Sequence, residues 1–228
     1  MTFSIVVRCE RTGHFGVAAV TGTPGVGTLL TWAKADVGAI ATQGWINPYL
    51  GIDGLDLLGN GHPADKALQA VVSLDDDREL RQAGAVDALG RSAAFTGGAC
   101  ADWCGHEHGD GWSVQGNLLE GHETLEACAK AYFDSEGKDL VERLMAALEA
   151  GEEAGGDRRG ARSATVFVVA SELYPLWDLR VDDHDDPLHE LRRLSERLGE
   201  TLLPQILKLP TRRDACGQLR ADSDAGLV

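Results

Sequence analysis

The sequence lacks any apolar run long enough to cross a lipid bilayer, and it lacks an excess of basic residues. A membrane-spanning helix needs about 20 consecutive apolar residues, so we expect no such helix and no membrane partner. Lysine and arginine together number 21 against 36 aspartates and glutamates, which gives a net charge of −15 at pH 7. Nucleic acids and anionic membranes repel a chain of this charge at long range. The composition therefore argues against nucleic acid as a partner.

Cysteines are few and irregularly spaced. There are five, an odd number: Cys9, Cys100, Cys104, Cys128 and Cys216. A disulfide framework uses an even number at regular spacing in a small secreted domain, so this pattern indicates a reducing compartment. The first residues also lack the basic segment and the longer apolar core of a secretory signal peptide. We expect a cytoplasmic protein.

Sequence fingerprints of a nucleotide cofactor are absent. No G-x-G-x-x-G sequence opens a helix after a strand, and there is no phosphate-loop lysine motif. The glycine-rich stretch from Gly97 to Gly111, interpreted as a loop, carries Cys100, Cys104, His106 and His108, which are zinc-ligand types. Their spacing differs from the usual zinc-binding pairs, and histidines held by hydrogen bonds explain the loop equally well. We expect no cofactor and no metal, with a structural zinc as the open alternative.

Most apolar runs form neighbouring pairs of predicted strands. The clearest pairs are residues 3–8 with 15–20, 84–88 with 92–95, and 164–170 with 176–181. Predicted helices lie between these groups, two of them consecutive after residue 122. Strands that are adjacent along the chain favour antiparallel pairing. The pattern therefore predicts an α+β fold in which helices cover two mainly antiparallel sheets.

The chain is expected to form one domain over residues 1–199 and an extension over residues 200–228. The last amphipathic helix begins at Pro187 and is predicted to end at Gly199. Beyond it the helical pattern is lost, so the extension is expected to be partly disordered or to pack on a partner subunit. Its leucines favour a homodimer.

Thr2 is the first candidate catalytic residue. It follows Met1 directly and opens a predicted strand, and removal of Met1 leaves a threonine with both a free amine and a hydroxyl. An α-amino group titrates near pH ~8, well below a lysine amine, so it is available as a base near neutrality. It can accept the proton of its own hydroxyl and make that oxygen a nucleophile. The alternative is that Met-Thr is an ordinary start to a strand.

Two further segments supply candidate catalytic groups. Asn117 closes the sequence Gln115-Gly116-Asn117, interpreted as lying just past a strand end, where its amide can donate to an oxyanion. Asp157 and Arg158 lie in a glycine-rich loop, where an arginine can bind a substrate carboxylate. The alternative for Asn117 is an ordinary turn after a strand, and the alternative for Asp157 and Arg158 is a solvated loop.

Three other residues are candidates for substrate binding. Gln43 and Asn47 lie at the exit of a predicted buried strand beside Trp45, a combination that suits the wall of a pocket. His184 follows a later strand beside Asp182 and Asp183. The alternatives are that Trp45 serves packing and that the acidic residues before Pro187 cap a helix.

Several segments together resemble the DUF1028 family. They are residues 1–8, 37–48, 113–119, 154–160 and 178–184, and the resemblance covers residues 1–198. That family is placed in the N-terminal nucleophile (Ntn) hydrolase superfamily, whose fold is a four-layer αββα sandwich. The resemblance implies this fold for the present chain.

The resemblance also implies an activity. Members of the superfamily attack an amide carbonyl with the hydroxyl or thiol of the first mature residue, and the match falls on Thr2 after loss of Met1. Asn117 is then the expected oxyanion donor, while Asp157 and Arg158 are expected to orient the amine or to bind substrate. This predicts a hydrolase of small amides. The alternative is a catalytically inactive binding or scaffolding protein on the same fold.

Overall fold

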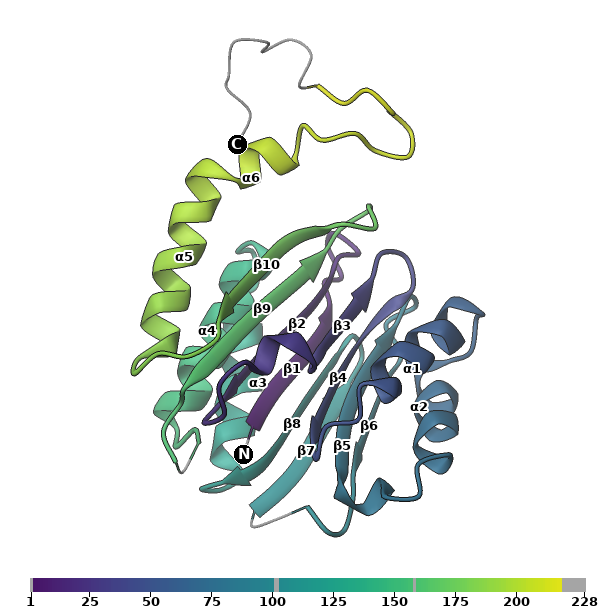
Figure 1. The fold of residues 1–228 in the computed structure, drawn as a ribbon, viewed down its shortest axis with the longest axis vertical. Helices are drawn as coiled ribbons and strands as arrows, with labels where there is room; N and C mark the ends of the chain where they lie inside the picture. Colours follow the sequence, from purple (N-terminus) through teal and green to yellow (C-terminus); the bar gives the residue numbers. More distant parts are fainter. Residues whose placement is uncertain (1, 101–102, 158, 219–228) are drawn as a thin grey trace.

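Two antiparallel β-sheets face one another in the computed structural model, which describes residues 2–100, 103–157 and 159–218 (Figure 1). The six-stranded sheet runs in the order β10 (Pro175–Val181), β9 (Ser163–Val169), β2 (Phe15–Thr21), β1 (Thr2–Arg8), β8 (Trp112–Leu119) and β7 (Trp103–Gly109). The four-stranded sheet runs in the order β3 (Thr31–Lys34), β4 (Gly38–Gly44), β5 (Arg81–Asp87) and β6 (Ser92–Thr96).

Helices cover the outer face of each sheet. α1 (Tyr49–Gly59) and α2 (Ala64–Ser73) pack on the smaller sheet, and α3 (Glu123–Asp134), α4 (Leu140–Glu153) and α5 (Pro187–Thr201) pack on the larger one (Figure 1). The short α6 (Leu203–Ile206) follows α5, and 3₁₀ turns occupy Val26–Thr28 and Arg78–Leu80. This arrangement is a four-layer αββα sandwich, as predicted.

The alternation of side chains along β1 explains the layers. Phe3, Ile5 and Val7 belong to the core between the larger sheet and its helices, whereas Val6 belongs to the core between the two sheets. Both faces of this central strand are buried, and burial of each large apolar side chain contributes about 1.5–3 kcal/mol. The sheets are in close contact at Gly84 of β5, where any side chain would collide with the Gln115 amide of β8.

Two predictions about local structure are wrong. The stretch from Gly97 to Gly111 is not a loop throughout, because residues 103–109 form β7 and pair with β8. Gln115 and Asn117 lie inside β8, which continues to Leu119, rather than past its end. In both cases cross-strand pairing overrides the local preference of glycine for turns.

The C-terminal segment is only partly described. The helix predicted to end at Gly199 continues to Thr201, α6 follows, and the described chain ends at Gln218. The remainder of the predicted extension, residues 219–228, lies outside the described residues. Packing of this segment on a partner subunit stays a prediction.

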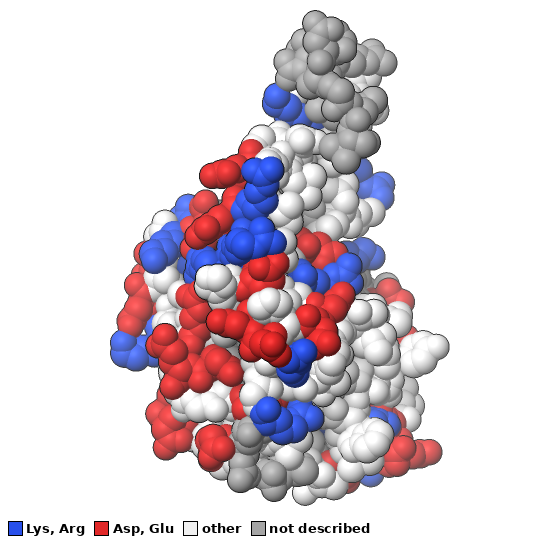
Figure 2. All heavy atoms as spheres, turned by 60° about the vertical axis from the view of Figure 1, so that its left-hand side comes forward, with Lys and Arg blue, Asp and Glu red and all other residues white. Residues whose placement is uncertain are grey.

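Acidic and basic side chains are interleaved on the face that carries α5 (Figure 2). Arg192 of α5 pairs with Glu142 and Glu149 of α4, and Arg162 pairs with Asp183 and Asp185. Basic residues on this face therefore have acidic partners. Within the described part of the chain, no helix is both long and apolar enough to cross a membrane.

Candidate active site

Thr2 lies at the first position of β1, in the interior of the larger sheet. Thr21 at the end of β2 is directly opposite it on one side, and Asn117 of β8 is directly opposite it on the other. Side chains of directly opposed residues share a face of the sheet, and this face is the one toward the smaller sheet. Thr2 is only 9% exposed, and its Oγ1 donates a hydrogen bond to Thr21 Oγ1 at 3.0 Å. Two hydroxyls and an amide thus form a row at one end of the sheet.

Two buried glutamines of the smaller sheet contact this row. Gln43 of β4 donates from Nε2 to the carbonyl oxygen of Thr2 at 3.2 Å and to Gln82 Oε1 at 2.8 Å. Asn117 Nδ2 donates to the same oxygen of Gln82 at 2.9 Å. An amide nitrogen carries two hydrogens, and Gln82 is the partner found for Asn117 Nδ2 among the described residues. The bond to Gln82 uses one of these hydrogens.

The orientation of each amide is fixed by its neighbours. Ser4 Oγ donates to Gln43 Oε1 at 2.6 Å, which directs the nitrogen of Gln43 toward Thr2 and Gln82. Gln82 Nε2 donates to Thr96 Oγ1 at 2.9 Å and to the carbonyl oxygen of Gly116 at 2.8 Å. Both glutamines are fully buried. Leaving one of their amides without a hydrogen bond would lower the stability of the fold by several kcal/mol, as for other buried polar groups. The network therefore holds Asn117 in one orientation.

Asp157 joins the chain segments that flank Thr2. Its side chain is completely buried and accepts hydrogen bonds from the backbone N–H of Gly22, which follows Thr21, and from the N–H of Arg159 at 2.8 Å. The Arg159 guanidinium binds the same carboxylate at 3.1 Å. An isolated bridge pairs Asp157 with Leu119, at the end of β8. Asp157 thus ties the turn after β2 to the end of β8, and no contact between Asp157 and Thr2 is found among the described residues.

Leu118 has an unusual backbone conformation directly after Asn117. Its φ is +59°, in the left-handed region, which costs a residue with a side chain about 1–2 kcal/mol. The conformation reverses the alternation of β8, so that Leu119 packs in the core on the helix side. Strained backbone of this kind is concentrated at functional sites, and here it adjoins the candidate oxyanion donor.

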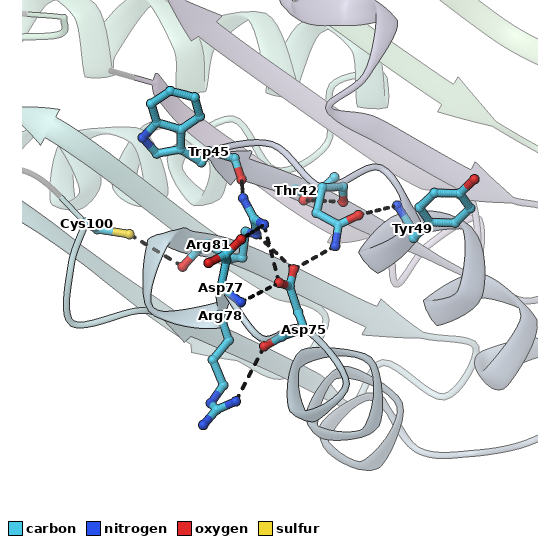
Figure 3. Close-up of polar contacts among 9 residues, drawn as sticks. Thr42, Trp45, Tyr49, Asp75, Asp77, Arg78, Arg81 and Cys100 are labelled. Carbon is cyan, nitrogen blue, oxygen red and sulfur yellow. Dashed lines mark hydrogen bonds and ion pairs between the residues drawn. The ribbon is translucent and has the colours of Figure 1, made fainter.

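Asn47 belongs to a cluster beside this end of the smaller sheet (Figure 3). Its amide donates to Asp75 Oδ2 at 2.6 Å, and the Arg81 Nε donates to the same oxygen at 2.8 Å. Arg81 also donates to the carbonyl oxygen of Trp45 at 2.9 Å. The hydrogen bond from Arg81, together with that from Asn47, lowers the pKa of Asp75 to about 2. The cluster holds the segment after β4 against the start of β5, next to Gln43 and Gln82.

The remaining predicted site residues are not brought to Thr2. His184 is exposed, and its Nδ1 accepts a hydrogen bond from the backbone N–H of Asp186 at 2.9 Å. Arg158 lies outside the described residues. Their roles in substrate binding stay predictions.

The cysteines and histidines predicted as an alternative zinc site lie along and just before β7. His106 Nδ1 is 2.8 Å from Thr96 Oγ1, and His108 Nδ1 is 3.0 Å from Ser92 Oγ. Cys104 Sγ donates to the carbonyl oxygen of Cys100 at 3.5 Å. Within residues 2–100, 103–157 and 159–218, no group of three or more potential ligands is arranged to hold a metal ion.

Sequence reasoning missed Thr21 and Gln82. Thr21 is the single polar residue of β2 and ends that strand, a signal that could have found it, whereas Gln82 follows Arg81 near the start of β5 and carries no such signal. Their position beside Thr2 depends on strand order and register, which the local sequence does not contain. Five cavities of about 170 to 620 Å³ lie elsewhere on the described part of the chain.

Comparisons with known proteins identify the family. Residues 2–191 match the model of a family of unknown function, DUF1028. The crystal structure of a DUF1028 protein from Silicibacter pomeroyi is 31% identical, covers 95% of this chain and 98% of its own, and superposes with a TM-score of 0.87. No curated protein sequence matches.

Two structures of the protein Anbu are more distant. A Gly-1 mutant from Hyphomicrobium sp. strain MC1 and the ancestral beta-subunit from Yersinia bercovieri are each 12% identical, with TM-scores of 0.43 and 0.40. They cover 92% and 91% of this chain and 98% of their own. Similarity at this level carries no argument about activity. On the family model and the Silicibacter structure, the chain belongs to the DUF1028 family.

Proposed function

We propose that the protein is an amide hydrolase whose nucleophile is the hydroxyl of Thr2, made N-terminal by removal of Met1. The observation that carries this proposal is the position of Thr2. It begins an interior strand of the larger sheet, with Thr21 and Asn117 directly opposite it on the two neighbouring strands. The hydroxyls of Thr2 and Thr21 thus lie beside the amide of Asn117 at one end of the sheet. Removal of Met1 adds the free amine of Thr2.

The reaction follows from the groups present. The Thr2 amine accepts the hydroxyl proton as Oγ1 bonds to the amide carbon, and the carbonyl oxygen becomes an oxyanion that Asn117 Nδ2 stabilises. The carbon–nitrogen bond then breaks, and the amine returns the proton to the leaving nitrogen. Water attacks the resulting ester and gives a proton to the same amine. The amine passes that proton to Thr2 Oγ1 as the ester bond breaks, which releases the acid and restores Thr2. Asp157 acts as a positioning residue, since it binds the segments on both sides of Thr2.

A catalytically inactive binding protein is the second candidate. It is favoured by one observation, namely the burial of Thr2, which is only 9% exposed. The two candidates differ in the fate of Met1. The hydrolase requires its removal, whereas the binding protein does not.

Periodate distinguishes an N-terminal Thr2 from a retained Met1, because it cleaves the bond between two carbons when one carries a free amine and the other a hydroxyl. We expect the intact mass of protein from cells to correspond to loss of Met1, and we expect periodate to convert unfolded protein to an N-terminal glyoxylyl form. The Thr2→Ala variant is the matched control, since its terminus has no hydroxyl to react. The processed protein is then assayed with a panel of small amides. Retained Met1 and resistance of the wild-type chain to periodate would contradict the hydrolase.

A further inference from the structure

The outer edge of the smaller sheet is free along β6. β6 is the last strand in the order β3-β4-β5-β6 and pairs only with β5 among the described residues. The N–H of Gly97 bonds to the carbonyl of Arg81, and the N–H of Asp87 bonds to the carbonyl of Arg91. Bonding alternates along an antiparallel pair, so the odd-numbered residues of β6 face β5. The backbone N–H and C=O groups of Ser92, Ala94 and Thr96 therefore point outward.

A groove of about 620 Å³ runs along this free edge, the largest of the five cavities described. Its floor is formed by residues 92–95 of β6, which are buried or half-buried. Exposed residues of α2, including Asp65 and Gln69, form one rim, and exposed His108 of β7 forms the other. Leu68 and Val72 of α2 and Phe95 make its interior largely apolar. The unpaired backbone groups thus lie at the bottom of an apolar groove rather than on a flat surface.

An acidic and a basic residue line opposite ends of the groove, and each has an exposed partner on the neighbouring residue: Asp65 pairs with Lys66 and Arg78 with Glu79. Asp65 lies at the Ser92 end, because the adjacent N–H of Ala64 bonds to Asp87, whose own N–H bonds to Arg91. Arg78 lies at the Phe95 end, because a Cβ at Gly97 would meet the Arg78 carbonyl. Both side chains line the groove.

We propose that this groove binds an extended peptide segment, which adds to β6 as a further strand. Backbone groups of Ser92, Ala94 and Thr96 supply the main-chain hydrogen bonds, and the apolar interior takes alternate side chains of the peptide. The charges favour a segment with an acidic group at the Phe95 end and a basic group at the Ser92 end. This proposal does not rest on the hydrolase activity.

A second copy of the chain is the other occupant that the test distinguishes. It has two edge strands in its smaller sheet, β3 and β6. Light scattering separates such a dimer from a bound peptide.

The test uses the full-length protein and a random heptapeptide library displayed on phage. Enriched peptides are synthesised with an N-terminal fluorophore, and their binding is measured by fluorescence anisotropy. We expect the Ala94→Pro variant to bind at least about tenfold more weakly, because proline removes an outward N–H and obstructs a close backbone approach. The N–H of Ala94 does not bond to β5, so pairing within the sheet is retained. Ala94→Ser, which keeps that N–H, is the matched control and should bind as the wild type does.

Charge and exchange measurements complete the test. Arg78→Glu should reverse the preferred charge of the peptide at the Phe95 end, and Thr2→Ala should bind with unchanged affinity. Bound peptide should slow hydrogen exchange at the backbone N–H of Ser92, Ala94 and Thr96, a readout on the wild-type chain that stands even if Ala94→Pro fails to fold. Three results would each overturn the proposal. The library enriches no peptide, the wild type and Ala94→Pro bind a peptide equally, or light scattering shows a wild-type dimer that Ala94→Pro dissociates.

Discussion

Replacing Thr2 with alanine is expected to abolish amide hydrolysis while the chain still folds. The variant lacks the hydroxyl that forms the new bond, and loss of a nucleophile lowers kcat by as much as about 10⁶-fold. The structural cost is small. Among the described residues, the variant loses the 3.0 Å hydrogen bond to Thr21 Oγ1, and a hydrogen bond contributes about 1 kcal/mol. Turnover of the best amide from the panel and the midpoint of thermal unfolding are the two measurements.

Two companion variants locate the effect in the chemistry. Thr2→Ser keeps both amine and hydroxyl and should retain turnover, because processing and nucleophile are preserved. Thr21→Ala removes the partner of the Thr2 hydroxyl without removing the nucleophile, so its loss of activity should be far smaller than that of Thr2→Ala. Wild-type turnover in Thr2→Ala would show that another residue attacks the amide.

The sequence contains enough information to place Thr2 but not its neighbours. Alternating apolar residues from Phe3 to Val7 predict a buried strand, and that strand is the central β1. Thr21 and Asn117 pair with Thr2 although they are separated from it by 19 and 115 positions along the chain. No local pattern encodes that register. The proposed role of Thr2 was therefore predictable, whereas the row that it joins was not.

Polar residues inside strands were the harder part of the prediction. The sequence predicts that Gln115 lies at a strand end, and Gln82 lies just before the strand predicted over residues 84–88. In the structure both glutamines are buried between the sheets. Gln82 bonds to Gln43 and to a backbone carbonyl, and Gln115 bonds to Ser4, which in turn bonds to Gln43. A polar side chain can be buried only where partners satisfy it. Gln82 has one in Gly116 of the other sheet, and Gln115 has them in Ser4 and Ser113 of its own sheet. Pairing of two sheets must be known before such a residue can be assigned to the interior.

Replacing Arg81 with methionine is expected to lower the free energy of unfolding by about 3–5 kcal/mol, the cost typical of breaking a buried ion pair. Arg81 and Asp75 side chains are only 14% and 8% exposed. The variant leaves the Asp75 carboxylate buried without its main cation and also loses the bond to the Trp45 carbonyl. Urea denaturation at pH 7 measures the effect. The matched control is Lys130→Met, which breaks an ion pair whose side chains are 76% and 63% exposed and should cost less than about 1 kcal/mol.

The pH dependence of the free energy of unfolding distinguishes the contribution of the Asp75–Arg81 ion pair from that of side-chain packing. The pKa of Asp75 is about 2 in the folded chain against an ordinary 3.8. A carboxyl whose pKa is lowered by folding stabilises the protein above its unfolded pKa and loses that contribution as pH falls. The wild type should therefore lose about 2 kcal/mol from this group between about pH 4 and pH 2. Asp75→Asn has no carboxyl to titrate and should lack this loss. Arg81→Met should reduce it, because the guanidinium is the main cause of the low pKa. If the acid loss were the same in all three proteins, the pair would not be what holds the segment after β4 against β5.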